Sequence, residues 1–294
     1  NYVTPDTTRK NIAYGAGICV SKGSNMKING GTISSNMASS TKANATYAAG
    51  QEGGGIAVCE ASTVIITGGK IDNNKAYDGG GIAIRGDSTV TMSGSITVGT
   101  DASGNKDMVL SSNGSITNNF AYMEGGGVYM ANGTEKGNTF NLTNGYVANN
   151  SVSTSGSLWG QGGGIFMGQW CVINLSGGRI ENNQAYDGGG ILGWYAVMKI
   201  TNGEIKGNTA QRNGGGIYND YGNLTFDNGK IYNNSATKEG GGVFCYSMNN
   251  NNYTAAKMTV TGGSILNNGA GTDGGGIYFE GTHSTTKGAL KITG

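Results

Sequence analysis

The chain has 294 residues, of which 57 are glycine and one is proline, and only 13% are charged. The formal net charge of +1 gives no electrostatic reason to expect binding to nucleic acid or to an anionic membrane. No apolar run is long enough to span a bilayer, and no signal-peptide pattern is present. A single histidine, His283, leaves little room for histidine-based catalysis.

The four cysteines are too few for a disulfide framework, and their spacings match no zinc motif. Cys19 and Cys59 lie on the same type of predicted strand but two residues out of step. A bridge between them is geometrically possible but not favoured, so we expect four free thiols.

A glycine triplet recurs along the whole chain. It begins as GAGI at Gly15 and continues as GGGI or GGGV at Gly53, Gly79, Gly125, Gly162, Gly188, Gly214, Gly240 and Gly274. Four of the eight intervals are 26 residues long, and the others are 38, 46, 37 and 34. The spacing predicts a structural unit of 26 residues that carries insertions in several copies.

Each unit holds three short strand-like pieces separated by turn residues. Between Gly214 and Ala236 these pieces are GGGIYN, NLTFDNG and KIYNNSA, and no helical periodicity is present. The pattern predicts an all-β fold, a right-handed parallel β-helix of about nine to ten coils, with residues 1–294 forming one domain. Because the first residues and the final ALKITG fall in mid-coil, we expect a fragment of a longer repeat protein that is open at both ends.

Two columns of the repeat describe the predicted interior. In the second coil the inward set is Ile56, Val58, Val64, Ile66 and Ile71, with the small Ala76 at a corner. An asparagine column reads Asn36, Asn74, Asn119, Asn150, Asn183, Asn208, Asn234 and Asn268. Coils stack at roughly 4.8 Å, so this column predicts a ladder in which each asparagine bonds its own backbone and the next asparagine.

The repeat resembles that of a known family. The string IYNNSATKEGGGVF is similar to the repeats of the chlamydial polymorphic outer membrane proteins, whose signatures are FxxN and GGA(I/L/V). Here I-x-N-N replaces the first signature and GGG(I/V) the second, and the likeness covers nearly the whole chain. It implies an extracellular passenger or stalk on a bacterial surface that adheres to hosts, although no autotransporter barrel lies in this sequence.

The strand after each triplet predicts an outer face of uneven character. If Ile82 and Ile84 point inward, Gly79, Gly81, Ala83 and Arg85 point outward, and the glycines leave a low floor. The outward column beside that floor reads Cys19, Ala57, Ala83, Tyr129, Phe166, Leu192, Tyr218, Phe244 and Tyr278. It is small in the first three coils and large in the last six.

All three tryptophans fall near this face, and insertions at 39–52, 131–138, 153–161 and 246–257 flank it. We therefore select as candidate ligand-binding residues Trp159, Phe166, Trp170, Leu192, Trp194, Tyr218, Tyr221, Phe244 and Tyr246. Flat aromatic rings with little charge suit a host glycan or another surface ligand. The alternative is that the rings stabilise the coils by stacking on one another beneath an inserted loop.

A polar column precedes each triplet, and six of its eight members are carboxylates. Those six are Glu52, Asp78, Glu124, Asp187, Glu239 and Asp273. Calcium could bridge neighbouring carboxylates. The amides at Gln161 and Asn213 favour another interpretation, in which each side chain accepts hydrogen bonds from the glycine N–H groups that follow. We therefore expect no cofactor, with calcium as the alternative.

Catalysis and ice binding are the remaining alternatives. The off-pattern residues Asp220, Glu280 and Arg85 lie in different coils, whereas a polysaccharide lyase or hydrolase needs a local cluster. Thr259 and Thr261 form a Thr-x-Thr pair of the kind that an ice-binding face repeats, but Lys or Asp interrupts the row in other coils. The sequence favours an extracellular bacterial adhesin or its stalk over both alternatives. Residues 95–113 are predicted to be either a loop or an irregular extra coil.

Overall fold

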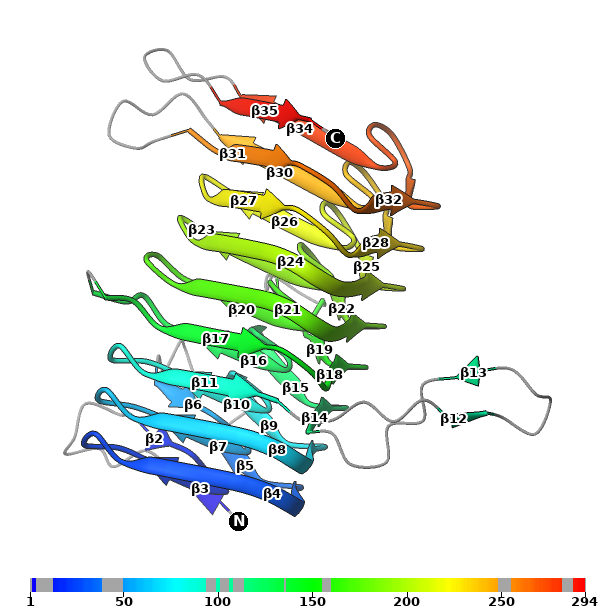
Figure 1. The fold of residues 1–294 in the computed structure, drawn as a ribbon. Helices are drawn as coiled ribbons and strands as arrows, with labels where there is room; N and C mark the ends of the chain where they lie inside the picture. Colours follow the sequence, from blue (N-terminus) through cyan, green and yellow to red (C-terminus); the bar gives the residue numbers. More distant parts are fainter. Residues whose placement is uncertain are drawn as a thin grey trace.

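A computed structural model describes residues 2–3, 13–38, 50–93, 99–100, 106–107, 114–134, 136–154, 160–247, 255–281 and 288–293. These residues contain no helix and form a stack of coils with the two termini at opposite ends (Figure 1). Three parallel sheets run along the stack, which is a parallel β-helix, as the repeat predicts.

Each coil contributes in turn to sheets A, B and C. Sheet A contains β1 (Tyr2–Val3), β2 (Ala13–Tyr14), β5 (Met37–Ala38), β6 (Gln51–Glu52), β9 (Lys75–Asp78), β15 (Phe120–Glu124), β19 (Ser151–Val152), β22 (Gln184–Ala185), β25 (Thr209–Ala210), β29 (Ser235–Ala236) and β33 (Gly269–Ala270). Sheet B contains β3 (Ile18–Val20), β7 (Ile56–Val58), β10 (Ile82–Ile84), β16 (Val128–Met130), β20 (Ile165–Met167), β23 (Ile191–Trp194), β26 (Ile217–Asp220), β30 (Val243–Ser247) and β34 (Ile277–Gly281).

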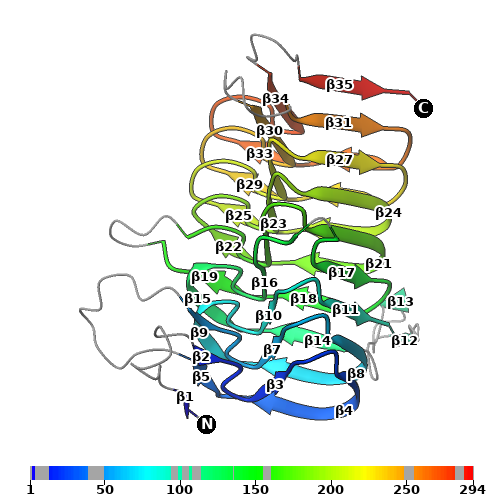
Figure 2. The ribbon, with the colours of Figure 1, turned by 90° about the vertical axis from the view of Figure 1, so that its left-hand side faces the viewer.

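Sheet C follows sheet B in each coil. It contains β4 (Asn25–Ser34), β8 (Thr63–Asp72), β11 (Thr89–Met92), β14 (Ser115–Thr117), β17 (Thr139–Leu142), β18 (Tyr146–Ala148), β21 (Val172–Glu181), β24 (Val197–Lys206), β27 (Asn223–Phe226), β28 (Lys230–Tyr232), β31 (Lys257–Val260), β32 (Ser264–Leu266) and β35 (Ala289–Ile292). Figure 2 shows strands of sheets A and C on opposite flanks of the stack.

The insertions leave the register of the coils unchanged. Ile82 on β10 pairs with Ile56 of the preceding coil and with Val128 of the following one, although Val128 lies 46 residues further along the chain. The strand ladders therefore continue in register on either side of the insertion. Within 95–113, the short strands β12 (Gly99–Thr100) and β13 (Lys106–Asp107) pair antiparallel with each other and join none of the three sheets (Figure 1). This described part is a hairpin, not an extra coil.

The predicted interior is buried. Ile56, Val58, Val64, Ile66 and Ile71 belong to one apolar cluster that extends through the stack. Ala76, in the corner position expected of it, is also fully buried. Equivalent aliphatic residues thus stack on one another in register, and each coil covers the apolar face of its neighbour.

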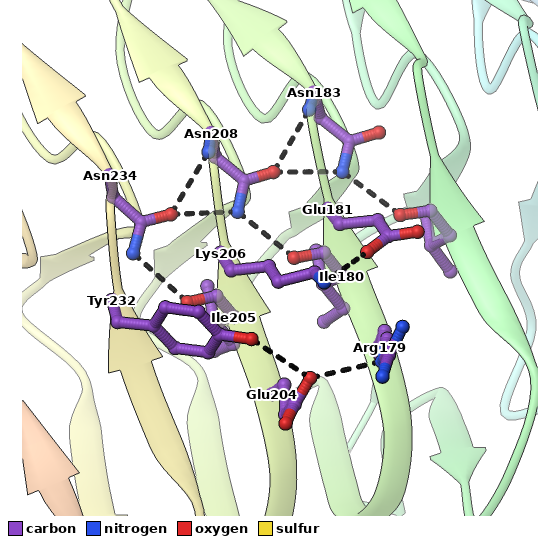
Figure 3. A network of polar contacts seen from close by, with 11 residues as sticks. Arg179, Ile180, Glu181, Asn183, Glu204, Ile205, Lys206, Asn208, Tyr232 and Asn234 are labelled. Carbon is purple, nitrogen blue, oxygen red and sulfur yellow. Dashed lines mark hydrogen bonds and ion pairs between the residues drawn. The ribbon is translucent and has the colours of Figure 1, made fainter. Parts of the chain in front are cut away.

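All eight predicted asparagines form a ladder, in which Asn268 is half-buried and the other seven are buried. The backbone N–H and the Nδ2 of Asn183 both donate to Oδ1 of Asn208, at 2.9 and 3.0 Å. The second Nδ2 hydrogen of Asn183 bonds the carbonyl of Val147 at 3.0 Å. Asn208 repeats the pattern with Asn234 and with the carbonyl of Ile180 (Figure 3). The accepting carbonyl lies one coil back, not in the asparagine's own coil as we predicted.

The residue before each ladder asparagine supplies the turn. It lies in the left-handed region, as Asn182 (φ 55) and Asn233 (φ 55) illustrate. Asparagine tolerates this conformation better than most residues do. The two residues of the recurrent Asn-Asn pair therefore have different roles: the first forms the turn and the second belongs to the ladder.

The glycine triplets are buried, which corrects the predicted outer floor. Gly79 has a φ of 66°, and this left-handed residue ends the strand alternation on which the prediction rested. A Cβ on Gly81 would lie 2.6 Å from the carbonyl oxygen of Gly127 and 2.8 Å from Cγ2 of Ile116. Gly81 therefore faces the interior, where only glycine leaves room for the adjacent coil.

Candidate functional site

The outward column of sheet B forms a covered stack. Four of the candidate binding residues are nearly inaccessible: Phe166 (5% exposed), Leu192 (3%), Tyr218 (8%) and Phe244 (3%). Phe244 stacks on Tyr278 with ring centroids 5.3 Å apart and planes 3° apart. These four side chains are not accessible to a ligand. Their burial favours the alternative interpretation, in which they stabilise the coils by packing on one another.

A second group of aromatic residues is exposed at the corner between sheets B and C. This corner cluster consists of Trp170, Trp194, Tyr195, Tyr221 and Tyr246. Trp170 is 58% exposed and Trp194 37%, and the three tyrosines are half-buried. Tyr195 and Tyr221 stack with centroids 4.8 Å apart, and Trp194 meets Tyr195 edge-on at 5.1 Å. The remaining candidate, Trp159, lies outside the described residues.

The backbone holds the corner cluster in unusual conformations. Trp170 (φ 66), Tyr195 (φ 52) and Tyr221 (φ 55) all lie in the left-handed region, which bulky side chains rarely adopt. Hydrogen bonds between coils hold them in place. The N–H of Tyr195 donates to the backbone carbonyl of Asp220, and the N–H of Tyr221 donates to the backbone carbonyl of Tyr246. The sequence prediction missed Tyr195. Aligning the fourth residue after Ile191 and Ile217 would have paired Tyr195 with Tyr221.

A carboxyl group lies between two rings of the corner cluster. Asp220 on β26 is in register with Trp194 on β23 and with Tyr246 on β30. Its Oδ1 is buried and has no hydrogen-bond partner among the described residues. Burial, followed by the charge of Asp187, raises the pKa of Asp220 to about 7. Asp220 is therefore a buried carboxyl group beneath the rings, and its unbonded oxygen does not reach the surface.

The polar column before the triplets does not bond the glycines that follow it, which overturns our favoured interpretation. The N–H of Gly53 instead donates to the carbonyl of Asp78 in the next coil, at 3.1 Å. Column side chains accept from the next member of the column, as Asp187 Oδ1 does from the N–H of Asn213 at 3.1 Å. Among the described residues, no three His, Cys, Asp or Glu side chains converge in a way that could hold a metal ion.

Two arginines neutralise part of this column. Arg85 pairs with the buried Glu52 at 3.3 Å. Arg212 binds the fully buried Asp187 through Nε at 3.0 Å and also through Nη2. Between these pairs, burial raises the pKa of Glu124 to about 7. The column therefore contains three buried carboxyl groups, Glu52, Asp78 and Asp187, and only two of them are paired with an arginine.

The off-pattern polar residues do not form a catalytic cluster. The charge of Asp187 raises the pKa of Asp220, but Asp187 is fully buried and already paired with Arg212. Arg85 lies in the third coil beside Glu52, far along the stack from Asp220. Thr259 has Thr225 and Lys291 as its strand neighbours, so a Lys interrupts the proposed threonine row. All four cysteines are unbridged.

No protein family, curated protein or solved structure matches the chain. In the part of the chain that the structure describes, no helix is long and apolar enough to cross a membrane.

Proposed function

We propose that the chain is part of an extracellular bacterial surface adhesin that binds host glycans through the corner cluster. The observation that carries the proposal is the set of exposed or half-exposed rings on successive coils, Trp170, Trp194, Tyr195, Tyr221 and Tyr246. The resemblance of the repeat to those of surface passengers supports the location. A ligand that is a surface protein is the alternative partner.

The geometry suits a sugar ring in two ways. The apolar face of a pyranose packs against a flat aromatic ring, and Trp170 and Trp194 offer the largest exposed ring surfaces. Because the coils stack at roughly 4.8 Å, equivalent positions repeat along the stack, as successive sugars do along a chain.

A passive stalk is the second candidate function. The buried asparagine ladder and the apolar core explain a rigid rod without any ligand. They do not explain why Trp170 and Tyr195 occupy left-handed positions where asparagine or glycine costs less. Strain of this kind, at an exposed aromatic surface, favours a binding role over a purely structural one.

The test is a glycan array with the purified chain, run with and without calcium. We expect reproducible hits, and Trp170→Ala should weaken binding to the best glycan by about tenfold or more, or about 1.4 kcal/mol. Ile65→Ala is the matched control, since Ile65 is an exposed apolar residue on sheet C, away from the cluster. Thermal melting should barely change in either variant.

Three outcomes would contradict the proposal. A blank array would leave a protein-binding adhesin or a stalk as the better explanation. Equal binding by wild type and Trp170→Ala would place any glycan site elsewhere. Hits that appear only with calcium would return the carboxylate column to consideration as a cation-dependent site.

A further inference from the structure

A hollow lies on the outer side of sheet B in the first three coils, at the opposite end of that sheet's face from the aromatic stack. Its volume is about 310 Å³, and it is lined by Tyr14, Cys19, Ser21, Lys22, Glu60 and Arg85 among others. Of the small residues in the outward column, Cys19 lines the hollow, whereas Ala57 and Ala83 are fully buried and do not line it.

The contrast with later coils explains why the hollow exists. From Tyr129 onward the same column carries large side chains, which pack on one another and cover the sheet. The small side chain of Cys19 leaves that space open in the first coil. Arg85, two residues beyond Ala83 in the sequence, extends into the region together with Tyr14.

The Arg85 guanidinium is held in place but only partly used. Its Nη1 donates to the Tyr14 hydroxyl at 2.5 Å and pairs with Glu52 Oε1 at 3.3 Å. The Tyr14 ring also lies against the guanidinium, with 5.2 Å between Cζ and the ring centroid. Among the described residues, Nε and Nη2 have no hydrogen-bond partner, and the side chain is 29% exposed.

We propose that this hollow binds the carboxylate of an acidic sugar, such as a uronic acid or a sialic acid. A guanidinium presents parallel N–H donors that match a carboxylate in a bidentate pair, and Tyr14 and Glu52 already fix its position. Glu52 and Glu60 balance Arg85 and Lys22, so the fork of Arg85 rather than an excess of positive charge selects the carboxylate. The Ser21 hydroxyl can bond the sugar's own hydroxyl groups.

The charge on the rim sets the direction of binding. Glu60 is exposed at the edge of the hollow and repels a carboxylate, so the acid group must lie on the side of Arg85. This site is independent of the corner cluster. It would exist even if the cluster bound nothing, and Trp170→Ala should leave it unchanged.

Calorimetric titration with single sugars tests the site. D-glucuronate, D-galacturonate and N-acetylneuraminate should bind the wild-type chain, and D-glucose and D-galactose should not. Cys19→Tyr places in the hollow the type of side chain that later coils carry and preserves the Arg85–Glu52 pair. We expect it to weaken binding by about tenfold or more. Lys27→Ala, an exposed lysine on sheet C, is the control and should bind as wild type does.

Two further variants sharpen the result. Arg85→Lys keeps the charge beside Glu52 but removes the fork, so binding should weaken while the melting temperature changes little. Glu60→Gln removes the repulsion and should strengthen binding. The proposal is overturned if no acidic sugar binds, or if Cys19→Tyr binds as wild type does. It is equally overturned if inorganic sulfate or phosphate competes as well as the sugar acids, since the hollow would then be a general anion site.

Discussion

The asparagine ladder and the carboxylate column are two rows of largely buried polar side chains, one per coil, and their hydrogen-bonding groups are satisfied to different extents. An amide both donates and accepts, so each ladder asparagine completes the bonds of its neighbours. A carboxylate only accepts, so Glu52 and Asp187 need Arg85 and Arg212. A buried amide can therefore recur in every coil without a further partner. A buried carboxylate can recur only where a cation pairs with it or a proton neutralises it.

The largest effect is expected when an asparagine of the ladder is replaced by a carboxylate like those of the column. Asn183→Asp removes both Nδ2 donors and places a carboxylate against the carbonyl of Val147. We expect a loss of about 5 kcal/mol in the free energy of unfolding, or failure to fold. Urea unfolding followed by circular dichroism measures it.

The control for this change lies one residue away. Asn182→Asp alters an exposed residue in the left-handed region, which aspartate tolerates, so stability should change by less than about 0.5 kcal/mol. If both variants unfold at the wild-type urea concentration, the ladder does not contribute to stability as described here.

Removing a cation from the column should have the next largest effect. Arg212→Met leaves the fully buried Asp187 without its ion pair, which typically costs about 3 kcal/mol. Lys238→Met changes an exposed residue in the equivalent position of the following coil and should cost little. Equal urea midpoints for the two variants would show that Asp187 does not depend on Arg212.

The smallest effect concerns pH. Burial and the charge of Glu52 raise the pKa of Glu124 to about 7 from its ordinary 4.5, and Asp78 is a further charged neighbour. The folded chain therefore binds the proton more tightly than the unfolded chain. This contribution to stability is complete below about pH 4.5 and is lost as the pH rises through 7.

Glu124→Gln should therefore stabilise the chain by about 1–2 kcal/mol at pH 8 and by little at pH 5. Thermal melting of both proteins at the two pH values measures the difference. Glu60→Gln removes an exposed carboxylate and should leave the pH dependence of the wild type unaltered. A melting temperature that falls equally with pH in wild type and Glu124→Gln would assign the effect to other groups.

The repeat was sufficient to predict the architecture, because a strict period transmits register from coil to coil. The aliphatic positions, Ile56 and Ile71 among them, and the ladder positions followed from column identity alone. The prediction failed where the backbone leaves regular alternation. Gly79 turns into the left-handed region, so Gly81 faces inward although it is two residues from an outward position.

The candidate site was predicted less well, for a related reason. Column analysis finds which residues are equivalent but not what covers them, so Phe166 and Trp170 looked alike although one is buried and the other exposed. Tyr195 was missed because its role comes from a corner conformation, not from a strand position. Arg85 and Arg212 do not recur at the equivalent positions of other coils. The repeat pattern marks such residues as exceptions but does not predict which side chains they contact.

The asparagine ladder also has a direction. In every step the donors belong to the earlier coil and the accepting Oδ1 to the later one, from Asn36 to Asn74 and onward to Asn268. The side-chain dipoles therefore add along the rod, as peptide dipoles add along a helix. The rod is electrically polar along its axis. A coil joined to either end continues the ladder only in the same orientation, since a reversed coil would set donor against donor after Asn268 and acceptor against acceptor before Asn36.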